Sequence, residues 1–439
     1  MKATRIITTV FIALASLAAN AQEGAWNGEL NIMGTKLPLV FNFSGDGCTM
    51  DSPSQGAKGI PAEKTIKDDG TIKVSVAMIG ATFEGKMENG EIKGTYTQNG
   101  FPIPLTLKPG KLVVKRPQTP VAPFPYKEEN ISFTNAGYTF NGTLTLPQNY
   151  SKQTPVVLMV TGSGQQNRDE ELFDHKPFAV IADALARQGI ASLRYDDRGW
   201  NDKNIDFGQF TTADFLQDAA SALPLLRKRF NKVGILGHSE GGTIAMMLAA
   251  EGKADFIVSL AGMAISGKET LVMQNRQAMS AINLPKDMVD SYCATISNIL
   301  NEIANGKKTS EITIDGVPDN LKPILKRSLE QANSPYIRHF ITIDAGKQLS
   351  KIKCPVLALN GTKDTQVDCA ANTTILETGL SNCKHTIKKI DGVNHLFQHC
   401  STGSVVEYQQ IEETIAPEVL ETITKWINDQ QRTINEAQE

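Results

Sequence analysis

The stretch KVGILGHSEGGTIAMMLAA, residues 232–250, places Ser239 between glycines at the junction of two different patterns. Residues 233–236 form a continuous apolar run typical of a buried strand, and residues 243–250 are typical of a helix. A serine on such a strand-to-helix turn forms a nucleophile elbow, which exposes the hydroxyl, while the glycines avoid Cβ clashes. The alternative is a serine that only caps the helix. The strand before it and the helix after it favour the nucleophile.

The same alternation continues on both sides of this stretch. From residue 126 onward, apolar runs such as 189–196 alternate with helical stretches such as 212–229. Apolar strands separated by helices predict an α/β fold, with a mostly parallel sheet covered by helices on both faces. After Gly262 the strands stop, and the sequence is helical to about residue 345 before the alternation resumes. We therefore expect a helical cap inserted at about 263–345.

The N-terminal part of the chain has a different pattern. Residues 22–115 contain short alternating runs separated by turn dipeptides such as Asn89-Gly90 and Asn99-Gly100, which predict a small antiparallel β-domain, a curled sheet or barrel. Residues 116–125 are rich in proline and are interpreted as a stiff linker to a second domain at 126–439.

The first residues are typical of a signal peptide. Basic residues precede a short apolar run, and small residues before Ala21 fit a cleavage site, so we expect removal of residues 1–21 and a periplasmic or secreted protein. No later run approaches the length of a membrane span, so stable membrane insertion is not expected. The formal net charge of −3 argues against nucleic acid as a partner. The six cysteines and six histidines show no CxxC or HExxH spacing, so no metal is expected.

A nucleophilic serine needs a base and an acid that orients the base. In this architecture the acid follows the serine in sequence and the histidine comes last. Asp364 lies just past the strand-like run CPVLALNG, and His395 lies in the first loop after the next strand. Both positions are at the carboxyl edge of the sheet, where active groups gather. Asp368 and His399 are the alternative acid and base. Each lies four residues further along the chain, Asp368 in the next helix and His399 a further turn away.

The oxyanion of a tetrahedral intermediate needs N–H donors. One is expected from the residue after the nucleophile, Glu240, and the other from Ser163 in the loop VTGSGQQNRDE. Gly162 and Gly164 in that loop would let the backbone approach the substrate, although a simple glycine turn is the alternative. The Glu240 carboxylate is not needed for this role and could contact substrate or support the elbow.

Several segments together resemble a known family. GSGQQNRDE, HKPFAVIADALARQGIASLRYDDRG, GHSEGG, CPVLALNGTKD and NHLFQ, in this order, are similar to bacterial α/β-hydrolase carboxylesterases related to the serine-aminopeptidase-like hydrolases. Secreted Bacteroidetes members similarly carry a β-rich N-terminal domain. The resemblance implies an α/β-hydrolase fold, Ser239 as nucleophile, Asp364 as acid, His395 as base, and esterase activity on short acyl groups without a cofactor.

Two further expectations concern the cap and the cysteines. The methionines of the cap, such as Met263 and Met279, either line an adaptable substrate pocket or pack the core of the cap itself. Cys369 and Cys400 follow the carboxyl edge of neighbouring strands, so a disulfide between them would brace the acid and base loops. Free thiols are the alternative.

The sequence thus predicts a serine hydrolase that cleaves small carboxylic esters through an acyl-enzyme intermediate. A peptidase or amidase is the first alternative, because the same triad serves both leaving groups. Such a peptidase would need an acid for the substrate amine, and Glu240 and the run 169–171 are candidates. The second alternative is an envelope or glycan-binding protein, in which Trp26 and Tyr96 of the β-domain stack on sugars. The competing interpretation is that these aromatic residues form the core of the β-domain, which is the more common case.

Overall fold

The computed structural model describes residues 23–436, apart from 33–34, 46, 56, 112–114, 201, 203, 282–283 and 315–321. The expected signal peptide, residues 1–21, lies outside the described residues. The chain divides into two compact units. The smaller comprises residues 1–115 and 405–412, and the larger comprises residues 116–404 and 413–439.

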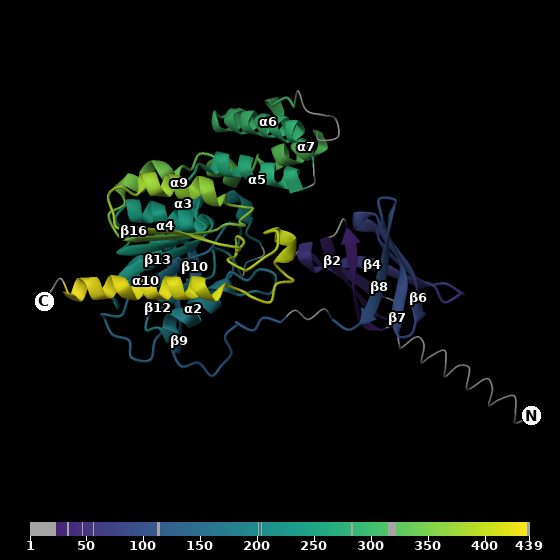
Figure 1. The fold of residues 1–439 in the computed structure, drawn as a ribbon, viewed down its shortest axis with the longest axis horizontal. Coiled ribbons are helices and arrows are strands. Elements are labelled where there is room, and N and C mark those ends of the chain that lie inside the picture. The colour runs from purple at the N-terminus through teal and green to yellow at the C-terminus, as the bar shows by residue number, and fades with distance from the viewer. Residues whose placement is uncertain are drawn as a thin grey trace, which may run out of the picture. The chain divides into compact units, whose positions relative to one another are not determined.

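The smaller unit is a closed antiparallel barrel, in which each strand pairs with the next and the last pairs with the first (Figure 1). Its strands are β1 (Gly24–Ile32), β2 (Thr35–Ser44), β3 (Gly47–Ser52), β4 (Ala57–Ile66), β5 (Ile72–Val76), β6 (Ala81–Glu88), β7 (Glu91–Gln98) and β8 (Phe101–Pro109). Positive φ at Asn89, Gly90, Asn99 and Gly100 fits the tight hairpins expected there. The predicted N-terminal antiparallel β-domain is confirmed.

The barrel interior is filled by aromatic and aliphatic side chains. Trp26 is 3% exposed and Tyr96 is 2% exposed, and both belong to this core. Phe41 and Phe83 pack beside them, with ring centroids 5.8 Å apart. Alternate residues of a strand face the interior, and these four occupy inward positions. The hypothesis that Trp26 and Tyr96 stack on sugars is therefore wrong, because neither ring is accessible.

The proline-rich segment 116–125 belongs to the larger unit. Arg116 Nη2 donates to Phe173 O at 2.8 Å, and Gln118 Nε2 donates to Ile415 O at 2.7 Å. The Gln118 side-chain oxygen also accepts the backbone N–H of Thr414 at 2.5 Å. The first residues of the expected linker are thus held against that unit by hydrogen bonds.

The larger unit is built on an eight-stranded sheet with the order β16-β15-β14-β13-β11-β12-β10-β9. The antiparallel hairpin β9-β10 occupies one edge, β10 is antiparallel to β12, and all other neighbours are parallel. The strands are β9 (Lys127–Asn135), β10 (Tyr138–Leu146), β11 (Val156–Val160), β12 (Ala191–Tyr195), β13 (Val233–His238), β14 (Phe256–Leu260), β15 (Val356–Gly361) and β16 (His385–Ile390).

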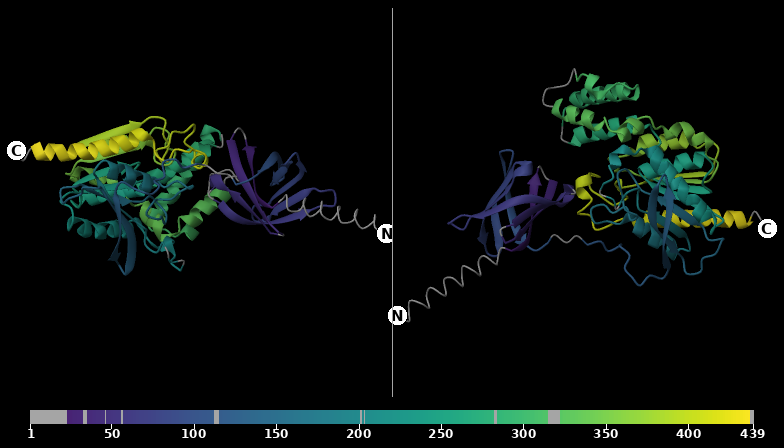
Figure 2. Two further views of the ribbon diagram at one scale, coloured as in Figure 1. Left: turned by 90° about the horizontal axis from the view of Figure 1, so that it is seen from below. Right: turned by 180° about the vertical axis from the view of Figure 1, so that it is seen from behind.

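Helices cover both faces of this sheet (Figures 1 and 2). Successive strand residues point to opposite faces, so Val157 packs with the core on one face and Leu158 with the core on the other. One face is covered by α2 (Pro177–Arg187) and α10 (Pro417–Glu436), the other by α3 (Thr212–Arg227), α4 (Glu240–Ala250) and α9 (Cys369–Gly379). Burial on both faces explains why the strands read as continuous apolar runs.

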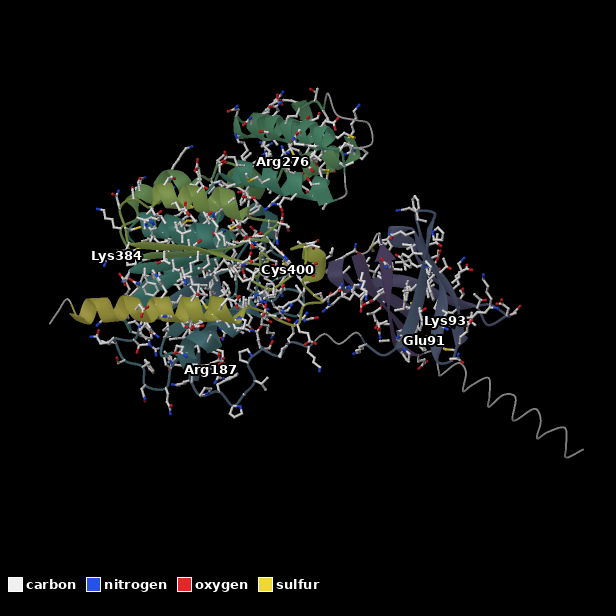
Figure 3. All side chains as sticks on the ribbon, in the orientation of Figure 1. Glu91, Lys93, Arg187, Arg276, Lys384 and Cys400 are labelled. Atoms are coloured by element: carbon white, nitrogen blue, oxygen red, sulfur yellow. The ribbon has the colours of Figure 1, made fainter. Side chains whose placement is uncertain are left out.

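The chain between β14 and β15 forms the helical insertion, hereafter the cap. It contains α5 (Gly267–Ala281), α6 (Lys286–Ala304), α7 (Lys322–Gln331) and α8 (Pro335–Phe340). Its own core includes Met279, Tyr292 and Leu325, and Arg276 of α5, labelled in Figure 3, forms an ion pair with Asp290 of α6. None of the helices in the described ranges has both the length and the apolar character needed to cross a bilayer.

Candidate active site

Ser239 lies between the end of β13 and the start of α4. Its backbone has φ 53° and ψ −119°, a conformation that costs energy in a residue other than glycine. The turn is held by a hydrogen bond from Ser239 N to Leu260 O at 2.8 Å. This strained turn places Ser239 on the wall of a cavity.

The glycines around Ser239 are required by the close approach of the backbone. A Cβ at Gly237 would lie 1.9 Å from Gly241 O, and a Cβ at Gly241 would lie 2.0 Å from Val160 O. Both distances are far shorter than a van der Waals contact, and in each case the obstacle is backbone. The glycines in the GxSxG pattern are thus explained by packing of main chain against main chain.

His395 and Asp364 are held together by a buried hydrogen bond. His395 Nδ1 lies 2.7 Å from Asp364 Oδ2, and the two side chains are 5% and 0% exposed. The other carboxylate oxygen of Asp364 accepts the N–H groups of Gln366 and Val367, each at 2.8 Å. This arrangement fixes the carboxylate and, through it, the histidine ring.

The alternative acid and base lie elsewhere. Asp368 caps the N-terminus of α9, because its side chain accepts the N–H of Ala371 at 2.8 Å. His399 is about half exposed and pairs with Glu413 and Glu418. Neither residue lines the cavity that contains Ser239 and His395.

That cavity has a volume of about 290 Å³ and is lined from both the sheet edge and the cap. Leu271, Tyr336 and Phe340 line it from the cap helices α5 and α8, while Met263 follows β14. The other lining residues are Gly162, Ser163, Gln166, Glu170, Leu172, His238, Ser239, Gln274, Ile337, Gln366, Val367, His395 and Leu396. Met263 therefore lies at the cavity, whereas Met279 packs in the core of the cap.

The chain is similar in part to several known proteins. Residues 175–297 match the family model of the serine aminopeptidase, S33. Esterase EstD of Thermotoga maritima is 26% identical over 304 residues, which cover 67% of this chain and 68% of that protein. Among solved structures, Est1E from Butyrivibrio proteoclasticus is 17% identical, with a TM-score of 0.41, and the alignment covers 69% of this chain and 98% of Est1E. Proline iminopeptidase of Mycobacterium smegmatis is 13% identical, with a TM-score of 0.44, over 70% and 100% of the two chains.

The larger unit has the α/β-hydrolase fold. Its strand order, its strand-to-helix turn at Ser239 and the family match over residues 175–297 agree on this assignment. The fold class predicted from the sequence is confirmed.

The loop after β11 of the α/β-hydrolase unit lies beside the elbow. A Cβ at Gly162 would come within 3.2 Å of Ser239 Cβ, so this glycine permits the close approach. Gly162 N donates to Glu170 Oε1 at 2.7 Å, which commits that N–H to the protein itself. Ser163 lines the cavity, whereas Gly164, at φ 92°, has open space around it and is not among the lining residues.

The Glu240 side chain is buried beneath the cap. It is 1% exposed, and its two oxygens accept hydrogen bonds from Thr212 Oγ1 at 2.5 Å and from Tyr336 OH at 2.7 Å. The same tyrosine hydroxyl lies 3.0 Å from Ser163 Oγ. Glu240 therefore connects the elbow to α3 and to cap helix α8. Tyr336 could not be foreseen from the sequence, because no local pattern links it to a residue 96 positions away.

Burial raises the pKa of Glu240, against the opposing effect of the hydrogen bonds from Thr212 and Tyr336. A carboxyl group whose pKa is raised on folding stabilises the fold most at low pH, and this contribution is lost as the pH rises through the folded-state pKa. We expect Glu240→Gln to raise the melting temperature relative to the natural protein by about 2 to 4 °C at pH 8, and by less at pH 5. Thermal unfolding at both pH values checks this, with the exposed Glu251→Gln as the control. An equal difference at both pH values would contradict it.

The acidic run 169–171 is also engaged by the protein. Asp169 pairs with Arg194, Glu171 lies 3.7 Å from Lys176, and one oxygen of Glu170 bonds the loop and His238. His238, the residue before Ser239, is not predicted from the sequence, and its position inside the GxSxG pattern is the available signal.

All six cysteines lie in the described ranges and are free thiols. The bridge considered between Cys369 and Cys400 is therefore absent. Cys369 Sγ lies 3.9 Å from Asn360 O, and Cys400 Sγ, in the loop labelled in Figure 3, lies 3.5 Å from Gly392 O. Cys369 thus faces the backbone of β15, and Cys400 faces the backbone of the loop after β16. Among the described residues, no group of three or more His, Cys, Asp or Glu side chains could hold a metal ion.

Proposed function

We propose that this protein is a serine hydrolase that cleaves small carboxylic esters through an acyl-enzyme intermediate. The observation that carries the proposal is that Ser239, on a strained elbow, and His395, fixed by Asp364, line one cavity. A serine hydroxyl becomes a nucleophile when a positioned base takes its proton. Among the described residues the Ser239 hydroxyl makes no hydrogen bond, and it does not cap α4.

The reaction assigns one role to each residue. Ser239 Oγ attacks the ester carbonyl while His395 takes the proton, and His395 then returns it to the leaving alcohol. Asp364 keeps the imidazole in the tautomer with the proton on Nδ1. The backbone N–H groups of Glu240 and Ser163 stabilise the oxyanion. Water then attacks the acyl-enzyme, with His395 again as base, and releases the carboxylic acid and free Ser239. No cofactor is required.

The substrate is a small molecule, because a cavity of about 290 Å³ lies at the lower end of the range for ligand pockets. Esters are favoured over peptides because Asp169 and Glu171 are paired with basic residues and Glu240 is covered by Tyr336. Glu170 lines the cavity, but it is 3% exposed and its Oε1 is engaged by Gly162 N and His238. A peptidase that binds a substrate amine needs an acid that is available to it. The similarity to esterase EstD agrees with this choice. We further propose that the protein acts in the periplasm or outside the cell, from the pattern of residues 1–21.

The decisive experiment compares two leaving groups on one enzyme preparation. We expect turnover of p-nitrophenyl acetate and butyrate, with slower turnover of octanoate, and little turnover of aminoacyl p-nitroanilides. The comparison uses kcat/KM for each substrate at pH 8. Faster cleavage of the anilides than of the esters would establish the peptidase instead.

A further inference from the structure

His238 and Glu170 form a buried pair beside His395. They are 7% and 3% exposed, respectively, and the rings of His238 and His395 lie 4.8 Å apart, centroid to centroid. Neither residue takes part in the acyl-transfer steps proposed above. A buried charged pair is costly to place in a protein, so its function needs its own account.

Both ring nitrogens of His238 face oxygen atoms. Nδ1 lies 3.0 Å from Glu170 Oε1, and Nε2 lies 3.0 Å from the backbone carbonyl oxygen of His395. A carbonyl oxygen cannot donate a hydrogen bond, so Nε2 must carry a proton. The remaining proton is then either on Nδ1, which makes the ring an imidazolium, or on the Glu170 carboxyl group.

The surroundings of Glu170 favour the proton on the ring. Glu170 Oε1 also accepts the N–H of Gly162 at 2.7 Å, and backbone N–H donors stabilise an ionised carboxylate. The other titratable groups close to His238 are His395 and the Asp364 carboxylate. Burial lowers the pKa of His238, but the charge and hydrogen bond of Glu170, the hydrogen bond to the His395 carbonyl and the charge of Asp364 together outweigh it, and the net shift is upward.

We propose that His238 is an imidazolium at neutral pH and acts as a positioning residue for His395. Its Nε2–H holds the main chain of His395, and its Nδ1–H, through Glu170, ties the loop of Gly162 to the same point. These bonds fix the main chain from which the His395 ring projects toward the cavity. The role of His395 as base rests on the proposed function, whereas the charge of His238 does not.

The same chain offers a buried histidine for comparison. His175 Nδ1 lies 2.9 Å from Thr414 Oγ1, and its Nε2 lies 2.9 Å from Gln398 Nε2. The Gln398 amide is oriented by its bonds to the side chain of Asn394 and the carbonyl of Glu413, so its nitrogen donates. His175 Nε2 must therefore accept, which makes this ring a neutral imidazole.

The charge states can be measured directly. In the full chain labelled with ¹⁵N-histidine, we expect His238 to show two protonated nitrogens at pH 7, where an ordinary histidine is mostly neutral. His175 should show one protonated and one bare nitrogen at pH 7. Assignment uses His238→Gln and His175→Gln. A bare Nδ1 on His238 at pH 7 would place the proton on Glu170 and overturn the proposal.

The positioning role is measured by the separate values of kcat and KM for p-nitrophenyl butyrate. His238→Gln removes the ring that joins the His395 carbonyl to Glu170, so kcat should fall on the order of 10- to 100-fold while KM changes little. In His175→Gln both values should stay unchanged. An unchanged kcat in His238→Gln would overturn the positioning role. If the protein hydrolyses no ester at all, the proposed function fails, and the labelling experiment still decides the charge.

Discussion

Replacement of Ser239 by alanine is expected to reduce kcat for ester hydrolysis on the order of 10⁵- to 10⁶-fold, because the attacking oxygen is removed. The protein should remain folded, since the change deletes a single oxygen that has no hydrogen-bond partner in the described structure. Steady-state release of p-nitrophenol and the melting temperature, measured on one preparation, check both points. A phosphonate probe should label the natural protein at one serine and leave the variant unlabelled.

The control for this change is Ser221→Ala. Ser221 lies on α3, is partly buried, and donates to Asp218 O at 2.7 Å, but it does not line the cavity. Its loss should leave kcat unchanged. If Ser239→Ala keeps its activity, Ser239 is not the nucleophile, and the acyl-enzyme proposal fails.

Asp364→Asn is expected to lower kcat on the order of 10⁴-fold, because it would hold His395 in the wrong tautomer. One oxygen of Asp364 accepts two backbone N–H groups, from Gln366 and Val367. An asparagine would keep its oxygen on that side and present its NH₂ group to His395 Nδ1. That nitrogen would then have to accept, the proton would move to Nε2, and the ring could no longer take a proton from Ser239.

Asp368→Asn provides the matched control. Asp368 caps α9, and asparagine is an equally good cap, so both stability and activity should be retained. The rate of p-nitrophenyl butyrate hydrolysis, measured for both variants at saturating substrate, tests the pair. If Asp368→Asn were inactive and Asp364→Asn active, Asp368 rather than Asp364 would be the acid that orients His395.

The elements around Ser239 could be predicted because each has a local signal. Apolar runs in the sequence mark β11 and β13. Asp364 and His395 each follow a predicted parallel strand, so the sequence alone places both at the carboxyl edge of the sheet. The turn residues Asn89 and Asn99 likewise predict hairpins. The structure adds the hydrogen bond that joins Asp364 to His395.

Other features had no local signal. The contact of Glu240 with Tyr336, and that of His238 with Glu170, join segments far apart in the chain. Alternation predicts that half the residues of a strand face inward, but not which half, so Trp26 could be read as exposed although it is 3% exposed. Cys369 and Cys400 follow the same edge of the sheet in sequence, but this position did not predict whether their thiols meet, and they form no disulfide.

The close backbone contacts at the elbow restrict which positions around the cavity can be substituted. Gly237 and Gly241 have main-chain atoms within about 2 Å of any added Cβ, so a randomised library at these positions should return glycine alone. Leu271 and Phe340, by contrast, line the same cavity from cap helices outside the sheet. Variation there can change the shape of the cavity without disturbing the turn at Ser239. New substrate ranges should therefore arise in this enzyme from substitutions in the cap, and directed evolution should begin there.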